Sequence, residues 1–248
     1  MKPPRLTVVV LAARFVGHDQ PAQHLGEACR AALNGAYAVG LTLAADAALA
    51  QRVSLCAAGT LATHGETLQV SLGEGPCVQA LNQMAPVLAD DVDDADAVRQ
   101  WPTYAEQARA HGIRAIFALP VLGGPDPAQQ PGLVLCLYRD RPGPIPEADL
   151  HLAQDHADAA DLLLLATPTP NAEDLAHAWL LPADAVVHQA TGMISYRHAV
   201  SISQALALLR AHAHTQGTDL STLAHAVVHE RLTLPGLSGP PAPGLPPQ

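Results

Sequence analysis

Two closely spaced prolines, in the run Thr167-Pro168-Thr169-Pro170-Asn171, constrain the fold of this chain more than any other feature. Proline has no amide donor and disfavours helical geometry in the residue before it, so no helix or central strand passes through this run. A chain of 248 residues has room for two modest domains. We predict a first domain at 5–166, a linker at 167–172, a second domain at 173–234 and a tail at 235–248. The tail, PGLSGPPAPGLPPQ, is too rich in proline and glycine to form a packed core and is predicted to be disordered.

The second predicted domain shows the helical period three times. Between Pro182 and Leu232, apolar residues recur at spacings of three and four, which places them on one side of a helix. The three stripes are Val186, Ala190 and Ile194; Ala205, Leu208, Leu209 and His212; and Leu220, Leu223, Ala224, Val227 and Val228. Ser201 and Gln204 form a capping-box pair before the second stripe, and Gly217 follows it as a left-handed stop. Because helices this short are not stable alone, we predict an all-α domain in which three helices share one core.

The first predicted domain combines helices with short strands. Arg5 to Tyr37 is predicted to be helical, although Thr7 to Val10 fits a strand equally well. Short apolar or alternating runs, rich in β-branched residues, are predicted to be strands at 38–43, 53–57, 67–72, 86–88, 115–121 and 133–138. A closing helix is predicted to begin near Pro146 and to end at Leu165. One sheet with helices over a face makes an α+β domain.

The run Leu72-Gly73-Glu74-Gly75-Pro76-Cys77 is the strongest local signal in the first domain. Two glycines and a proline before a helical pattern predict a tight turn, whose free amides either face an anionic ligand or belong only to the turn. Cys77 is then either a ligand contact or redox sensor at a helix N-terminus, or a small buried residue. Trp101 and Tyr104 are scarce aromatic residues that either close over a pocket or pack against the sheet.

No combination of residues points to catalysis, a metal ion or a cofactor. An acidic cluster lacks the central glycine and terminal glutamate of an EF-hand, so we predict a solvated acidic loop. Its members are Asp90, Asp91, Asp93, Asp94 and Asp96. His225 and His229 share a helix face, but no cysteine or carboxylate set completes a metal site. The only lysine is Lys2, which excludes a P-loop, and we expect no enzymatic activity.

Composition limits the type of core, the compartment and the partners that we expect for the protein. Apolar residues make up 49% of the chain and aromatic residues 3%, so we expect a core of alanine, valine and leucine. No apolar run reaches the roughly 18 residues of a membrane span, and Arg14 interrupts the N-terminal one, which argues against a signal peptide. The 4 cysteines show no CxxC spacing, as is typical of reduced thiols in a cytoplasmic protein. The chain has 13 basic and 23 acidic residues, and such an acidic excess is unusual for a protein that binds nucleic acid.

The C-terminal helices resemble the ANTAR domain over nearly its full length. The matching positions are Gln189-Ala190-Thr191-Gly192-Met193, then Ala205-Leu206 with Leu209-Arg210, then Leu220, Ala224, Val227 and Val228. The resemblance implies a three-helix module that binds paired RNA hairpins and prevents a transcription terminator from forming. The RNA contacts that it implies come from Gln189, Thr191, Arg197 and Arg210. Alternatively, Arg197 caps the first helix and Arg210 pairs with a carboxylate.

The first domain resembles a GAF domain over roughly residues 25–165. The matching motifs are GEGPC at Gly73–Cys77, Trp101-Pro102, Gly112-Ile113-Arg114 before Phe117-Ala118-Leu119-Pro120, and Gly132-Leu133 with Tyr138. GAF domains are sensors with a central antiparallel sheet, and many enclose a small molecule. The resemblance therefore implies a ligand-binding site at Cys77, Trp101, Tyr104 and Phe117. GAF domains of this sort are found ahead of ANTAR modules, so each of the two assignments supports the other.

Together the two resemblances imply a cytoplasmic, non-enzymatic regulator in which a GAF sensor controls an RNA-binding ANTAR module. Such proteins are expected to be homodimers, and Leu162 to Leu165 offers apolar surface for this contact. A second hypothesis rests on Thr191 and Asp219, which stand where the ANTAR pattern has basic residues. On this hypothesis the module has lost RNA binding and acts in dimerisation or in protein–protein interaction.

Overall fold

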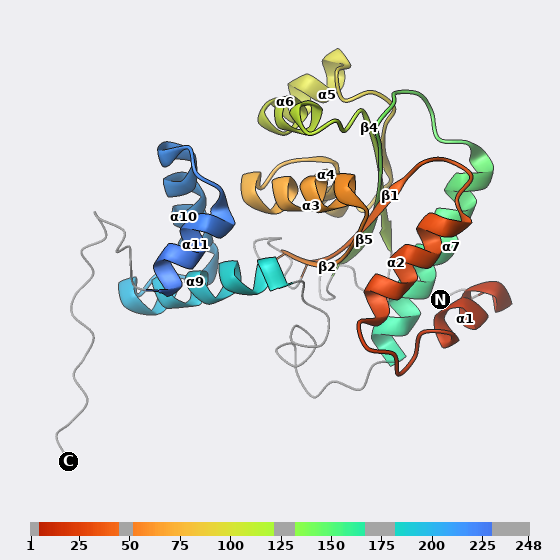
Figure 1. The fold of residues 1–248 in the computed structure, drawn as a ribbon, viewed down its shortest axis with the longest axis horizontal. Helices are drawn as coiled ribbons and strands as arrows, with labels where there is room; N and C mark the ends of the chain where they lie inside the picture. Colours follow the sequence, from red (N-terminus) through yellow and green to blue (C-terminus); the bar gives the residue numbers. More distant parts are fainter. Residues whose placement is uncertain (1–4, 45–51, 122–131, 167–181, 230–248) are drawn as a thin grey trace. The chain divides into compact units, whose positions relative to one another are not determined.

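The chain, in this computed structural model, divides into two compact units at the junction of Leu181 and Pro182. The described residues are 5–44, 52–121, 132–166 and 182–229 (Figure 1). The predicted linker at 167–172, the predicted start of the second domain at 173 and the predicted tail at 235–248 lie outside them. In the described residues, the first unit holds a sheet with helices on both faces, and the second holds helices.

One five-stranded antiparallel sheet forms the centre of the first unit, in the order β2-β1-β5-β4-β3. Its strands are β1 (Ala38–Ala44), β2 (Arg52–Ala58), β3 (Val87–Ala89), β4 (Ala115–Val121) and β5 (Gly132–Arg139). All five were predicted to within one residue at each end. The predicted strand at 67–72 is wrong, because this run belongs to helix α3 (Thr60–Leu72), which ends at the left-handed Gly73. Periodicity does not separate a short apolar run in a strand from one in a helix.

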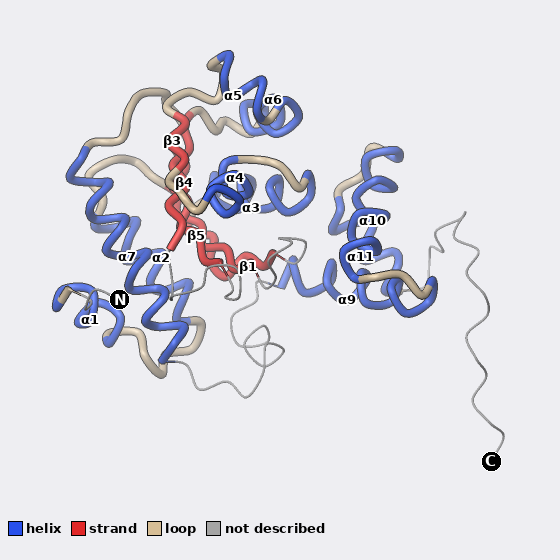
Figure 2. Tube along the Cα trace, turned by 180° about the vertical axis from the view of Figure 1, so that it is seen from behind, coloured by secondary structure: helices blue, strands red, loops and turns tan. Residues whose placement is uncertain are grey.

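Helices cover both faces of this sheet (Figure 2). On one face lie α1 (Leu6–Ala13), α2 (Pro21–Ala32) and α7 (Glu147–Ala166). On the other lie α3, α4 (Pro76–Gln83), α5 (Ala95–Gln100) and α6 (Pro102–Ala110). Helices α2, α7, α3 and α4 contact the strands directly, whereas α1 packs on α7 and α6 packs on α3. The predicted helix from Arg5 to Tyr37 is therefore two helices, and the left-handed residues Gly17 and Gln20 lie between them.

Strand β4 shows how the sheet separates two cores. Phe117 and Leu119 belong to the core beneath α2 and α7. Ile116 and Ala118 belong to the core beneath α3, α4 and α6. Successive side chains of a strand point to opposite faces, and helices cover both, so every residue of β4 is buried.

The second unit consists, in its described part, of α9 (Pro182–His198), α10 (Ile202–Gln216) and α11 (Leu220–Val228). The predicted capping box is confirmed, since the Ser201 hydroxyl accepts from the Gln204 amide and the Gln204 side chain accepts from the Ser201 amide. Gly217 ends α10 with a φ of 61°, as predicted. The buried stripe residues are Val186, Ala190, Ile194, Ala205, Leu209, Leu220, Leu223, Ala224 and Val227. The three helices contact one another through these stripes.

Candidate functional site

A cluster of polar side chains lies buried between α3 and the sheet. Glu66 and Gln69 stand one turn apart on α3, and each is only 2% exposed. The Glu66 carboxylate accepts hydrogen bonds from the hydroxyls of Thr42 on β1 and Tyr138 on β5, the latter at 2.6 Å. Because a buried carboxylate needs donors in place of water, these two hydroxyls fix α3 over the middle of the sheet.

Gln69 connects this carboxylate to further elements. Its Nε2 donates to the Tyr138 hydroxyl at 2.8 Å, and its Oε1 accepts from the Cys77 amide at 2.6 Å. The backbone carbonyl of Gln69 accepts from Nη2 of Arg52 on β2 at 3.0 Å. The first amides of a helix lack a partner within the helix. Here one of them, in α4, is satisfied by a glutamine of the chain itself.

Two glycines make room for the cluster. Gly40 on β1 lies under Glu66, and a Cβ added there would be 2.0 Å from Oε1. Gly65 on α3 lies against the ring of Tyr138, and a Cβ there would be 2.2 Å from Cε1. Neither neighbour is free to give way, because Tyr138 is completely buried and Glu66 is bonded at both oxygens. The crossing of α3 over β1 and β5 therefore requires glycine at both positions.

Two buried polar atoms beside the cluster have no hydrogen-bond partner among the described residues, namely Nε of Arg52 and the hydroxyl of Tyr104. Burial lowers the pKa of Arg52, whereas negative charge at Cys77 and Glu66 raises it. Burial raises the pKa of Tyr104 well above its ordinary value, so the hydroxyl remains a neutral donor. Buried donors without acceptors are costly. An acceptor group placed within reach of either donor would remove part of this cost.

Three of the four predicted ligand-binding residues lie on this side of the sheet. Cys77, Trp101 and Tyr104 are all part of the core beneath α3, α4 and α6. Phe117 lies on the opposite face, where its ring stacks 5.4 Å from the guanidinium carbon of Arg139. Phe117 therefore cannot share a pocket with the other three, and that part of the prediction is wrong because strand side chains alternate. The ligand-binding role of the other three stays a prediction.

Open space lies on the outer side of this core. A cavity of about 340 Å³ is lined in part by Glu74, Gly75, Val78 and Trp101. A second, of about 400 Å³, is lined in part by Asp94 and again by Trp101. Trp101 also belongs to the buried core. This places its side chain at the boundary between the solvent and the polar core.

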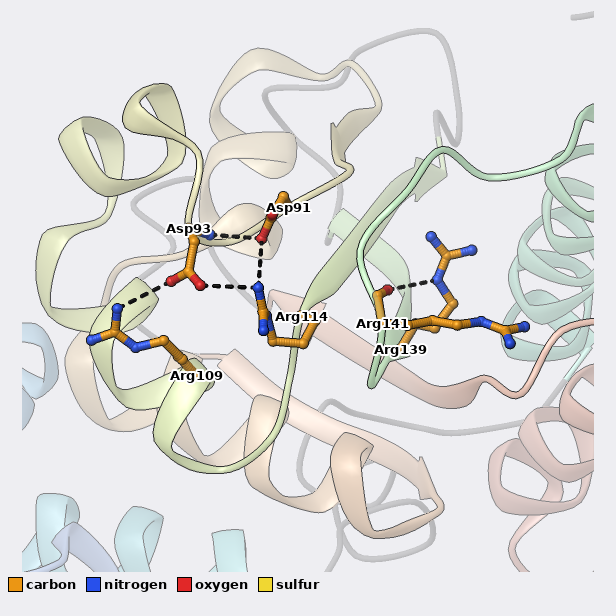
Figure 3. A network of polar contacts seen from close by, with 6 residues as sticks. All are labelled: Asp91, Asp93, Arg109, Arg114, Arg139 and Arg141. Atoms are coloured by element: carbon orange, nitrogen blue, oxygen red, sulfur yellow. Dashed lines mark hydrogen bonds and ion pairs between the residues drawn. The ribbon is translucent and has the colours of Figure 1, made fainter.

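The acidic cluster is solvent-exposed, as predicted, apart from the half-buried Asp91, and the carboxylates of Asp91 and Asp93 also pair with arginines. Nη2 of Arg114 lies 3.0 Å from Asp93 and 3.6 Å from Asp91 (Figure 3). Nη1 of Arg109 lies 3.2 Å from the other oxygen of Asp93. Asp91 and Asp93 thus form solvent-accessible ion pairs with two arginines. In the part of the chain that the structure describes, no group of three His, Cys, Asp or Glu residues could hold a metal ion.

The four residues predicted to contact RNA differ in how far they are exposed to solvent. Thr191 is 2% exposed, and its hydroxyl donates to the Val187 carbonyl at 2.7 Å. Its side chain lies in the three-helix core, so the prediction that it contacts RNA is wrong. Gln189 and Arg197 are exposed on α9, and Arg210 is half-buried on α10.

Tyr196 is a candidate contact that the sequence analysis missed. It is 82% exposed on α9, directly beside Arg197. The other aromatic residues that the structure describes are all buried: Phe15, Tyr37, Trp101, Tyr104, Phe117 and Tyr138. The signal was present, because Tyr196 falls two residues after the buried Ile194 and hence off the apolar stripe. An exposed aromatic ring beside cationic and polar groups is suited to stacking on a nucleic-acid base.

In the described residues, a covered antiparallel sheet with a buried polar cluster is followed in the chain by a separate three-helix unit. The GAF domain model matches residues 19–164, and the ANTAR domain model matches residues 181–228. The chain therefore belongs to the GAF domain family, and the ANTAR domain that follows makes it a regulator of the ANTAR family. No curated protein matches the chain. Among the described helices, none combines the length and the apolar character needed to cross a membrane.

Proposed function

We propose that this chain is a signal-responsive transcription antitermination regulator. Its GAF domain senses a small molecule, and its ANTAR domain binds paired hairpins in nascent RNA so that a terminator does not form. The order of the two domains carries this proposal, since a sensor precedes an RNA-binding module in one chain. The protein acts in the cytoplasm as a homodimer and has no enzymatic activity of its own.

The exposed face of α9 supplies the proposed RNA contacts. Gln189 and Arg197 are exposed there, and the Arg197 guanidinium can bind a phosphate through two parallel hydrogen bonds. Tyr196 offers its ring to an unpaired base of a hairpin loop, an interaction worth about 1–3 kcal/mol. Arg210 on α10 adds a second phosphate contact.

The polar core of the first unit supplies the proposed sensor site. A ligand enters beside Trp101, which lines the neighbouring cavities. It accepts hydrogen bonds from Nε of Arg52 and from the Tyr104 hydroxyl, the two buried atoms without partners among the described residues. Ligand binding changes the activity of the ANTAR domain only to the extent that the ligand prefers one state of the protein.

Exposed apolar side chains at both ends of the first unit's sequence supply the proposed dimer contact. Leu6 on α1 is 77% exposed and Leu165 at the end of α7 is 74% exposed. Within the predicted run from Leu162 to Leu165, Leu163 is 1% exposed and belongs to the domain's own core. The contribution of this run to a dimer therefore comes mainly from Leu165.

A second candidate function is supported by the missing basic residues. Thr191 is buried, and Asp219 is the N-cap of α11, so neither supplies the positive charge that the ANTAR pattern has at these positions. The chain as a whole carries a formal net charge of -10. On this hypothesis the ANTAR domain no longer binds RNA and serves dimerisation or protein–protein interaction.

Fluorescence anisotropy with a two-hairpin RNA and a scrambled control, measured across a salt series, separates the two functions. Antitermination predicts tighter binding to the paired hairpins, weakening as salt rises. Arg197→Ala should weaken binding and reduce the salt slope by roughly one phosphate, about 0.7–0.9. Arg141→Ala is the matched control, because it removes an arginine that is also exposed but lies in the GAF domain. Equal, negligible binding to both RNAs at low salt would refute the first function and favour the second.

A further inference from the structure

The 4 cysteines of the chain form two pairs on opposite faces of the sheet. All are free and buried. Cys29 and Cys56 lie beneath α2 and α7, where burial raises the pKa of each to about 12. The Cys56 thiol donates to the Val39 carbonyl at 3.7 Å. This pair has the character of inert structural thiols.

Cys77 and Cys136 approach the same side-chain amide from two elements. Cys77 is the second residue of α4, and its amide lies 2.6 Å from Oε1 of Gln69. Cys136 lies in the middle of β5, and its Sγ is 4.0 Å from Nε2 of Gln69. Helix α4 packs directly on β5. Both cysteines therefore belong to one core on either side of this amide. A side-chain hydrogen bond with Cys77, second to burial, raises the pKa of Cys136.

The two thiols of this pair have different surroundings. Gln69 connects Cys77 to a cation, because its Oε1 accepts from the Cys77 amide and its backbone carbonyl accepts from Nη2 of Arg52. Cys77 also stands at the N-terminus of α4, where the helix dipole attracts negative charge. Cys136 lies in the central part of the sheet and is completely buried. These surroundings suit Cys77 as the attacking sulfur and Cys136 as the second, resolving thiol.

A cavity lies beside the turn that carries Cys77. This cavity of about 340 Å³ is lined in part by Glu74, Gly75 and Val78, which lie shortly before and directly after Cys77 in the chain. Gly75 contributes no side chain to that wall and has a φ of 130°, which a larger residue rarely adopts. Open space therefore borders the turn before Cys77 and the residue after it.

We propose that Cys77 and Cys136 form an intramolecular disulfide when the protein meets hydrogen peroxide. The Cys77 sulfur, having lost its proton, attacks one peroxide oxygen and becomes a sulfenic acid. The O–O bond breaks, and the departing hydroxide takes up that proton as water. The Cys136 sulfur then attacks the Cys77 sulfur, the S–S bond forms, and the S–O bond breaks to release a second water with the Cys136 proton. Two thiols lose two electrons, and one peroxide is reduced to two waters.

Peptide mapping of the full-length protein tests this disulfide. The protein is treated with hydrogen peroxide, denatured, alkylated and cleaved after glutamate. Cleavage places Cys77 in fragment 75–106 and Cys136 in fragment 107–147, whereas Cys29 and Cys56 share fragment 28–66. We expect a species that joins the first two fragments, with alkylation confined to the third. Dithiothreitol should return all 4 cysteines to alkylation.

Alanine variants supply the matched controls. Cys77→Ala should leave every remaining thiol free, Cys136→Ala should leave a sulfenic acid at Cys77 that dimedone traps, and Cys29→Ala should still form the link. Three wild-type results, which do not depend on how the variants fold, would each overturn the proposal. The first is full alkylation of all 4 cysteines after peroxide. The second is oxidation confined to fragment 28–66, and the third is over-oxidation of Cys77 with Cys136 free.

Discussion

Replacing Tyr138 with phenylalanine should destabilise the GAF domain by more than a single hydrogen bond. The hydroxyl donates to Glu66 at 2.6 Å and accepts from Gln69 at 2.8 Å. All three side chains are 2% exposed or less. Without the hydroxyl, a carboxylate oxygen loses a donor and an amide N–H loses its acceptor, both away from water. Each unsatisfied buried group costs about 1–3 kcal/mol, so the free energy of unfolding should fall by about 2–6 kcal/mol.

Urea denaturation followed by tryptophan fluorescence measures this loss. The chain has 2 tryptophans, so a Trp179→Phe background leaves Trp101, which is buried in the same core as Tyr138. Tyr196→Phe is the matched control, because it removes the same atom from a ring that is 82% exposed. It should change stability by less than about 0.5 kcal/mol. This expectation would be refuted if Tyr138→Phe lowered the free energy of unfolding by less than about 1 kcal/mol while its dependence on urea concentration stayed unchanged. In that case Tyr138, Glu66 and Gln69 would not depend on one another for their hydrogen bonds.

Three further substitutions follow from the same structure. Gly65→Ala should lower the melting temperature, because its Cβ would lie 2.2 Å from the buried Tyr138 ring. Gly192→Ala on α9 should instead raise the free energy of unfolding by about 0.5–1 kcal/mol, because its Cβ would have nothing within 4 Å. Burial lowers the pKa of His156, so the unfolded chain binds its proton first as pH falls. The stability this histidine contributes is present above about pH 6.5 and is lost below it. His156→Gln should therefore reduce the difference in urea midpoint between about pH 7.5 and pH 5.5.

The strands and the second unit were predictable because their patterns are local. Alternation at 115–121 and 133–138 marked β4 and β5, and Ser201 with Gln204 marked the start of α10. Each pattern depends on residues within one element. No knowledge of the neighbouring element was needed to recognise it.

The buried polar cluster was not predictable, because its members come together only across elements. The run at 67–72 was interpreted as a strand, which separated Gln69 from Glu66 and hid their common helical face. Thr42 and Tyr138 reach the cluster only through the pairing of β1 with β5. Thr191 is a different case, since it lies four residues after the buried Val187 on α9. The helical period therefore predicts a buried side chain at Thr191, whereas the ANTAR resemblance implied an RNA contact.

The acidic balance of the chain does not by itself decide whether it binds RNA, since exposed charges act over about 8 Å at physiological ionic strength. The side chains described in the second unit include two arginines, Arg197 and Arg210, and one carboxylate, that of Asp219. Each phosphate contact contributes about 0.7–0.9 to the salt slope. Two arginines then give a slope of about 1.4–1.8 for one ANTAR domain, and twice that for a homodimer that holds both hairpins. The slope therefore tests the paired-hairpin mechanism itself, because a value near that of one domain would leave the second hairpin without a partner.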